Sequence, residues 1–303
     1  MNSRPRRLRR VQLAVPGSSE KMLRKAAESK ADYVFCDLED AVAPAAKAGA
    51  RETVAWALNN LDWQKKTRCV RINDVSTEWC HDDIIQVVQN AGKNLDTLIL
   101  AKARDAADVL FVDRLLGQLE AKLRLPRKIG LEVLIEEAVA LQSVEAIAAA
   151  TPRLEALIFG MGDYSASQGI DSRALTGGSD YPGDIFHYAR FRIAMTARAA
   201  GLEAIDGPFP DFRNAEGFRT EARRARAVGM TGKWAIHPAQ IELALEEFTP
   251  TAADVAQARK IAAAYREAEA QGLGSCQVDG VMVDLAVLRL VQGTLDRADL
   301  IGI

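Results

Sequence analysis

Two carboxylates, Glu136 and Asp163, each follow a predicted strand in the middle of the chain. The stretch 128–167, KIGLEVLIEEAVALQSVEAIAAATPRLEALIFGMGDYSAS, predicts a strand, a helix and a second strand. Parallel strands joined by a helix place their C-terminal ends at one edge of the sheet. Two carboxylates at that edge, beside a glycine-flanked loop, are suitable oxygen ligands for a hard divalent cation such as magnesium. The alternative is that one or both are solvated loop acids.

Polar residues also follow the other predicted strands and extend this candidate site. They are Asp37, Glu39, Asp40, Arg71, Asn73, Lys102, Asp206 and His237. The set contains several acids, one arginine and one lysine, and no Ser–His or Cys–His pair placed for covalent catalysis. It predicts a metal and an anionic substrate held between cations.

Each of these residues also has a structural interpretation. Asp37 and Asp40 could cap or brace loops, and Arg71 could be their ion-pair partner. Lys102 could brace the same network, and His237, which precedes a proline, could be a structural hydrogen-bonding residue. The GMGDYSASQG segment is not a dinucleotide-binding loop, because the carboxylate in its middle would repel a pyrophosphate and its glycine spacing does not match.

Eight short aliphatic runs alternate with amphipathic segments and must position these residues. The predicted strands begin at Val11, Tyr33, Arg68, Thr97, Ile129, Ala156, Leu202 and Lys233. Nearly continuous apolar strands that alternate with one-sided helices indicate a parallel sheet covered on both faces. Eight such units predict an α/β fold of the (β/α)8 TIM-barrel type over residues 1–248. A doubly wound open sheet is the alternative.

Residues 249–303 exceed what a barrel needs. TPTAADVAQARKIAAAYREAEAQG predicts one long helix, capped by Thr251 and ending near Gly272. A short hairpin-like piece and a last apolar helix follow. We expect the apolar faces of this C-terminal helical extension to pack on a neighbouring subunit.

Composition excludes several other functions. With 49% hydrophobic residues and a net charge of −2, the chain has material for a large core and no global attraction for nucleic acid or anionic membranes. No apolar run approaches the roughly 20 residues that span a bilayer. The basic start, MNSRPRRLRR, lacks the apolar segment of a secretory signal and predicts a disordered solvated tail, with contact to an anionic ligand as the alternative. Four scattered cysteines without a CxxC pair fit a reducing cytoplasm.

Six motifs resemble the citrate lyase β-subunit-like (HpcH/HpaI aldolase) superfamily, and within it the L-malyl-CoA/β-methylmalyl-CoA lyases most closely. They are LAVPGS from Leu13, DLEDAVAP from Asp37, VRIN from Val70, FGMGDYSAS from Phe159, IDGPFPDF from Ile205 and GKWAIHPAQI from Gly232. The resemblance runs from about Arg9 into the last helix. It implies a magnesium-dependent barrel enzyme that cleaves 3-hydroxyacyl-CoA thioesters to acetyl-CoA or propionyl-CoA plus glyoxylate.

The resemblance also implies roles for single residues of this chain. Glu136 and Asp163 would hold magnesium, for which manganese could substitute, and Arg71 would stabilise the enolate oxygen. Asp284 would exchange a proton with the acyl carbon, after the C-terminal segment delivers it into a neighbouring active site of a homotrimer or homohexamer. Glu39 and Asp40 would orient the catalytic groups. Substrate contacts would come from Lys25 (a CoA phosphate), Arg71, Asp37, Lys102, Ile236 and His237.

Two departures and three alternative functions accompany the resemblance. Ala14 and Ser19 stand where some relatives carry an aromatic residue and an arginine that contact CoA, and the segment after Ser167, which should cover the substrate, is shorter. A thioesterase would use the same site, and a citramalyl-CoA lyase would release pyruvate. A citrate lyase β subunit would act with an acyl carrier protein. A non-catalytic scaffold fits the ring of acids least well.

Overall fold

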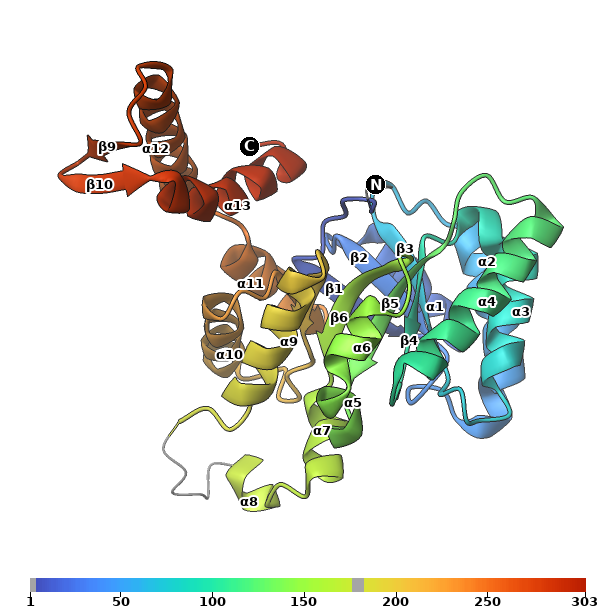
Figure 1. The fold of residues 1–303 in the computed structure, drawn as a ribbon. Coiled ribbons are helices and arrows are strands. Elements are labelled where there is room, and N and C mark those ends of the chain that lie inside the picture. The colour runs from blue at the N-terminus through green and yellow to red at the C-terminus, as the bar shows by residue number, and fades with distance from the viewer. Residues whose placement is uncertain (1–3, 176–182) are drawn as a thin grey trace. The chain divides into compact units, whose positions relative to one another are not determined.

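Eight parallel strands close into a barrel in the computed structural model, which describes residues 4–175 and 183–303 (Figure 1). The strands are β1 (Val11–Pro16), β2 (Tyr33–Asp37), β3 (Thr67–Ile72), β4 (Thr97–Leu100), β5 (Gly130–Ile135), β6 (Leu154–Phe159), β7 (Glu203–Asp206) and β8 (Gly232–Ala235). Parallel pairing of β1 with both β2 and β8 completes the closure. The predicted (β/α)8 barrel is therefore confirmed, and every strand begins within two residues of its predicted position.

Buried strands explain why these segments are almost continuously apolar. Inside the barrel a core cluster packs aromatic and aliphatic side chains from several of the strands, and helices cover the outer face. Its members are Tyr33, Phe35, Cys69, Ile99, Leu134, Ala156, Ile158, Ile205 and Trp234.

Helices follow the strands in the order that the sequence predicts. They are α1 (Glu20–Glu28), α2 (Lys47–Asn60), α3 (Cys80–Ala91), α4 (Ala106–Leu123), α5 (Ala138–Gln142), α6 (Val144–Ala149), α7 (Met161–Gln168), α8 (Ser172–Leu175), α9 (His187–Ala199), α10 (Ala215–Ala227) and α11 (Ala239–Phe248), with short 3₁₀ turns at Pro44–Ala46 and Gly92–Asn94. One local expectation is wrong: the segment predicted as a glycine-flanked loop is helix α7, which places Asp163 in a first helical turn. Part of the segment expected to cover the substrate, 176–182, lies outside the described residues.

The basic N-terminal segment is not wholly a solvated tail. Arg9 is 4% exposed and pairs with Glu132 and Glu155 at 2.8 and 2.5 Å. Arg10 pairs with Asp32 at 2.6 Å. These two arginines therefore belong to the folded barrel, which corrects the expectation for them.

By its internal contacts the chain divides into a barrel unit, essentially Arg9–Leu245, and a smaller unit of Arg6–Leu8 and Glu246–Ile303. The smaller unit holds α12 (Ala252–Ala270), the hairpin of β9 (Ser275–Val278) and β10 (Val281–Asp284), and α13 (Leu285–Ile301). The side chains of Thr251 and Asp254 form a reciprocal cap on α12. The helix, hairpin and last helix that the sequence predicts are all present.

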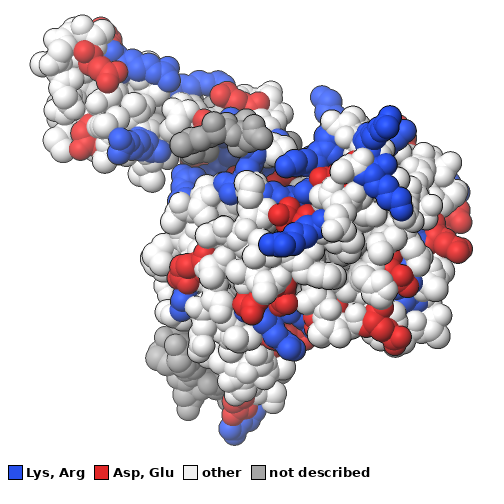
Figure 2. Space-filling view, turned by 45° about the vertical axis from the view of Figure 1, so that its right-hand side comes forward, with Lys and Arg blue, Asp and Glu red and all other residues white. Residues whose placement is uncertain are grey.

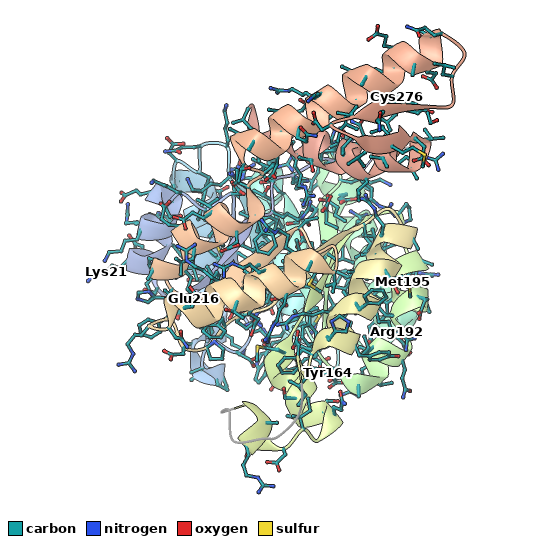
Figure 3. The ribbon with its side chains drawn as sticks, turned by 90° about the vertical axis from the view of Figure 1, so that its left-hand side faces the viewer. Lys21, Tyr164, Arg192, Met195, Glu216 and Cys276 are labelled. Atoms are coloured by element: carbon teal, nitrogen blue, oxygen red, sulfur yellow. The ribbon has the colours of Figure 1, made fainter. Side chains whose placement is uncertain are left out.

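Surface features of the described residues bear on partners and location. Acidic and basic side chains are interspersed on the face shown in Figure 2. All four cysteines are free; three are buried in the barrel unit and Cys276 lies on β9 (Figure 3). No helix in the described part of the chain is long and apolar enough to cross a membrane.

Close backbone contact between β6 and the end of β7 gives a test of the packing. A Cβ at Gly207 would lie 2.0 Å from the carbonyl oxygen of Phe159, whereas a Cβ at Gly117, inside α4, meets nothing within 4 Å. We expect Gly207→Ala to lower the free energy of unfolding by about 1–3 kcal/mol. Gly117→Ala, as matched control, should raise it by about 0.5–1 kcal/mol. Denaturant unfolding measures both, and a neutral Gly207→Ala would contradict the described packing.

Candidate active site at the C-terminal end of the barrel

A bidentate ion pair joins the ends of β2 and β3. Arg71 donates from Nε and Nη2 to the two carboxylate oxygens of Asp37, at 2.7 and 2.6 Å. Asp37 is 1% exposed and also accepts the backbone N–H groups of Glu39 and Ala41 at 2.9 and 3.1 Å. The carboxylate therefore braces its own loop and orients the arginine, as its structural interpretation predicts.

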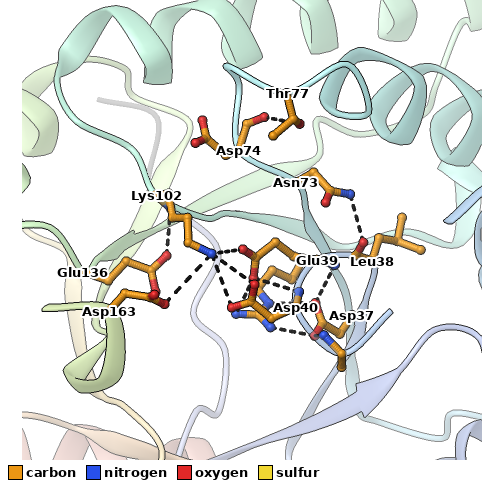
Figure 4. Close-up of polar contacts among 12 residues, drawn as sticks. Asp37, Leu38, Glu39, Asp40, Asn73, Asp74, Thr77, Lys102, Glu136 and Asp163 are labelled. Atoms are coloured by element: carbon orange, nitrogen blue, oxygen red, sulfur yellow. Dashed lines mark hydrogen bonds and ion pairs between the residues drawn. The ribbon is translucent and has the colours of Figure 1, made fainter. Parts of the chain in front are cut away.

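Lys102 connects this pair to the remaining acids (Figure 4). Its ammonium contacts the carboxylate of Glu39, lies 3.1 Å from Asp40 and 4.0 Å from Asp163. Glu39 in turn lies 3.0 Å from Nη1 of Arg71. The backbone of Lys102 has a φ of 50°, an uncommon left-handed conformation for a side-chain-bearing residue, and such strain is often found at functional sites.

A second lysine, which the sequence analysis did not single out, supports the acidic loop of residues 37–40 through its backbone. The Nζ of Lys47 donates to the carbonyl oxygens of Leu38 and Glu39 at 2.8 and 2.9 Å, and to Oδ1 of Asn73 at 2.6 Å. Because its partners are two backbone carbonyls and one amide, no charge pattern in the sequence indicates it. Only the fold reveals that this residue of α2 reaches the site.

Glu136 and Asp163 are brought together from the ends of β5 and β6, as predicted from the sequence. Glu136 is 3% exposed and accepts the backbone N–H of Lys102 at 2.8 Å. Gly160 leaves room for it, since a Cβ there would lie 2.8 Å from Oε2 of Glu136. Asp163 is more open, with its side chain 45% exposed. One carboxylate is thus fixed in the wall and the other faces outward.

Burial and mutual repulsion perturb these acids. Burial raises the pKa of Glu136 well above its usual range; Arg71 opposes this effect, while Glu39 and Asp163 add to it. Burial likewise raises the pKa of Glu39, against the opposing charges of Arg71 and Lys102. Burial therefore disfavours the charged forms of both acids, and the neighbouring carboxylates add to that effect.

The donor set fits a magnesium ion. Five carboxylates surround two cations here, namely Asp37, Glu39, Asp40, Glu136 and Asp163 with Arg71 and Lys102. A divalent cation between Glu136 and Asp163 would relieve the excess negative charge. Within the described ranges no group of three or more His, Cys, Asp or Glu side chains is placed to hold a metal. Two carboxylates suit magnesium, which keeps several waters and binds through one or two protein acids.

Aromatic rings lie beneath the arginine. The guanidinium carbon of Arg71 is 5.5 Å from the ring centre of Trp234 and 5.9 Å from that of Phe35. The two rings contact each other, with centres 4.4 Å apart. A cation over aromatic faces at this distance is attracted to them.

Asp206 does not join the other acids, which corrects its place in the predicted ring. It is 0% exposed, and its carboxylate lies 2.5 Å from the ammonium of Lys233 and 2.8 Å from Arg190 of α9. The side-chain alternation along β7 turns it toward the covering helices, while its neighbour Ile205 points into the barrel. The position at a strand end was predicted correctly, but the face was not.

The remaining predicted residues lie outside this cluster. Lys25 is an exposed side chain on α1. Ile236, 41% exposed, and His237 directly follow β8; the His237 ring stacks on Phe212 at 4.3 Å, and its Nδ1 accepts the backbone N–H of Ala239. Asp284 belongs to the smaller unit, where its carboxylate caps α13 by accepting the backbone N–H groups of the next helical residues at 2.9 and 3.0 Å.

Comparison with known proteins places this site in context. Residues 10–238 match the model of the HpcH/HpaI aldolase/citrate lyase family. The chain is 41% identical to an L-malyl-CoA/β-methylmalyl-CoA lyase of Cereibacter sphaeroides, over 98% of this chain and 97% of that protein. It is 34% identical to a mitochondrial citramalyl-CoA lyase of Rattus norvegicus, over 96% and 86%. A crystal structure of protein CitE from Mycobacterium tuberculosis, in complex with magnesium, acetoacetate and coenzyme A, superposes with a TM-score of 0.75 at 30% identity, covering 97% and 98%.

The raised pKa of Glu136 predicts that this residue destabilises the metal-free protein. We expect Glu136→Gln to raise the free energy of unfolding near pH 7 by at least about 1 kcal/mol, measured by denaturant unfolding in EDTA. The folded carboxyl has a pKa above its ordinary value of 4.5. The wild type therefore loses stability relative to the variant as the pH rises above about 4.5, and the difference disappears below it.

Glu137→Gln is the matched control for this prediction, because Glu137 forms an exposed ion pair with Arg104 at 3.0 Å. It should change stability by less than about 0.5 kcal/mol. Magnesium should then raise the melting temperature of the wild type and of Glu137→Gln, but not that of Glu136→Gln. A Glu136→Gln variant that is less stable at every pH would contradict the electrostatic argument.

Proposed function

The chain belongs to the HpcH/HpaI aldolase/citrate lyase family, and from this premise we propose that it is a magnesium-dependent L-malyl-CoA/β-methylmalyl-CoA lyase. The expected reaction is the reversible cleavage of these thioesters to glyoxylate and acetyl-CoA or propionyl-CoA. The observation that carries the proposal is the juxtaposition of Glu136 and Asp163 with the Arg71–Asp37 pair at the C-terminal end of the barrel.

Breaking the carbon–carbon bond leaves an electron pair next to the thioester, so the site must stabilise a CoA enolate. Arg71 is suited to this task because its bond to Asp37 fixes the guanidinium and its charge does not titrate. Charge that develops mainly in the transition state is the kind whose stabilisation raises the rate. Glu39, which pairs with both Arg71 and Lys102, fixes the position of the arginine relative to the loop of residues 37–40.

Glu136 and Asp163 would hold the magnesium ion. When bound, this ion would supply Lewis-acid polarisation of the substrate's hydroxyl and carboxylate oxygens. The mycobacterial CitE protein was crystallised in complex with magnesium and coenzyme A, which supports both as ligands of this family. We extend the proposal to manganese as a substitute, because carboxylate, carbonyl and water ligands suit both ions.

Proton exchange at the acyl carbon is assigned to Asp284, as acid in cleavage and base in condensation. We propose that residues 249–303 deliver it into a neighbouring subunit's site in a homotrimer or homohexamer. The exposed apolar side chains of the smaller unit, among them Val281, Met282 and Leu290, support such packing, because an exposed apolar surface marks a site of interaction.

The finer specificity is also part of the proposal. Lys25 would contact a CoA phosphate, Arg71, Lys102, Ile236 and His237 would make further substrate contacts, and the buried Asp37 would act on the substrate through Arg71. A citramalyl-CoA lyase differs in needing room for one methyl group, a difference of roughly 1–3 kcal/mol in binding. The free cysteines support a cytoplasmic location, where thiols stay reduced.

An assay of the purified protein with magnesium tests the proposal. We expect acetyl-CoA plus glyoxylate to give malyl-CoA, and propionyl-CoA plus glyoxylate to give methylmalyl-CoA, both detected by mass. Asp163→Asn should lower the rate and the magnesium affinity at least about 100-fold, because it removes a metal-ligand carboxylate and loss of even an outer-shell partner costs 10–100-fold. Free thiol released together with malate would indicate a thioesterase instead. Product only with pyruvate would indicate a citramalyl-CoA lyase.

Mixing two inactive variants tests whether sites are shared between subunits. Arg71→Lys and Asp284→Ala should each lose about 10²–10³-fold in rate. If each site combines Arg71 of one chain with Asp284 of the next, co-expression in equal amounts restores about one quarter of all sites, which is about one third of the sites in mixed trimers. Differential tags and size-exclusion chromatography isolate the mixed species. Absence of any recovery would show that both groups come from one chain.

A further inference from the structure

A chain of buried polar side chains runs through the barrel interior beneath the site, and the proposed reaction does not use it. Arg9 donates from Nε to Glu132 at 2.8 Å, and Gln12 donates from Nε2 to the other oxygen of Glu132 at 2.9 Å. The indole N–H of Trp234 then donates to Oε1 of Gln12 at 2.7 Å. Glu132 and Gln12 are 0% exposed and Trp234 is 4% exposed.

Such a chain is unusual in a core that is mostly apolar. Burying an amide and a carboxylate is unfavourable unless every polar atom finds a partner, and here the partners come from three strands and the N-terminal segment. A fully satisfied buried network fixes the rotamers of its members. Trp234 is therefore held in one orientation by a bond to its only polar side-chain atom.

The ring of Trp234 connects this hydrogen-bond network to the active site, because it contacts the guanidinium of Arg71. It forms, with Phe35, the surface on which the Arg71 guanidinium rests, at 5.5 and 5.9 Å from the two ring centres. Asp37 and Glu39 bind Arg71 through its N–H groups, whereas these rings contact the guanidinium through their faces. The contacts restrain the guanidinium in different directions.

We propose that Gln12 and Trp234 are positioning residues for Arg71, with Glu132 fixing Gln12 and Gln12 fixing the indole. This inference rests on the proposed function, because it assigns Arg71 as the group that stabilises the enolate. Gln12 acts only through Trp234, so the two residues form one functional unit. A position error of about 1 Å at a catalytic group lowers the rate far more than it alters substrate affinity.

Gln12→Leu and Trp234→Phe test the proposal in the full-length, magnesium-loaded protein, with malyl-CoA as substrate. Each should lower kcat about tenfold while KM stays within about twofold, since loss of a supporting partner typically costs 10–100-fold. The double variant should be no worse than the more impaired single variant, because the second substitution breaks a contact already lost. Additive losses would overturn the assignment of one unit.

Thr97→Val is the matched control, because it breaks another buried bond inside the same barrel, the 2.6 Å contact between Tyr33 and Thr97. This control should lower the melting temperature without lowering kcat. Gln12→Leu and Trp234→Phe variants that also keep wild-type kcat would show that the network serves stability alone, and would overturn the proposal. If one of the two variants fails to fold, the kcat of the other variant still tests the proposal.

A second readout separates this proposal from the proposed function. Phenylglyoxal modifies accessible arginines, and peptide mass spectrometry follows the rate at Arg71, which is 8% exposed. The rate should rise severalfold in Gln12→Leu and not in Thr97→Val. A wild type that cleaves none of the acyl-CoA thioesters refutes the proposed function, yet the labelling still tests positioning. Equal labelling in wild type and Gln12→Leu would refute positioning, whatever the activity.

Discussion

The arrangement of the site depends on the ion pair between Arg71 and Asp37. Adjacent residues in the register of β2 and β3 carry the two groups, so the sheet itself sets their separation. The pair is buried, and removing either partner would leave an uncompensated charge, which is far worse than lacking both. The other acids of the site are connected to this fixed unit. Glu39 pairs with the arginine, Asp40 and Asp163 lie near the ammonium of Lys102, and Glu136 accepts the backbone N–H of Lys102.

Around that pair the carboxylates outnumber the cations. Two features of the surrounding barrel, Lys47 and Gly160, allow these acids to lie close together. Lys47 donates hydrogen bonds to the backbone carbonyls of the loop that carries Glu39 and Asp40. Gly160 has no side chain, so the carboxylate of Glu136 can lie against its backbone. Such a site trades stability for binding capacity. The strained backbone of Lys102 fits the same account, since it places one side chain within reach of three carboxylates.

Much of this architecture could be predicted from the sequence, for a physical reason. Strands buried on both faces are mostly apolar, and an acid at the end of such a run marks a strand end, as Asp37 and Glu136 do. Glu132 and Glu155 are exceptions, because they are buried acids inside β5 and β6. It is harder to predict from the sequence toward which face of the sheet a strand-end side chain points. Asp206 has the same sequence pattern, yet its side chain points toward the covering helices. Gln12 and Arg9 could not be assigned, because their partner Glu132 is 120 and 123 residues away along the chain. Lys47 could not be assigned, because its ammonium donates to two backbone carbonyls and an amide oxygen rather than to a charged side chain.

Those sequence separations also govern how the chain reaches its native state. The salt bridge between Arg9 and Glu155 spans 146 residues, and the bond between Trp234 and Gln12 spans 222. Long-range contacts form slowly, since loop-closure entropy is lost before they contribute any stabilisation. The first strand has a nearby partner in β2, but Gln12 cannot accept the bond from Trp234 until more than three quarters of the polypeptide has been synthesised. Closure of the barrel and completion of its polar interior both require the eighth strand, because β8 pairs with β1 and carries Trp234.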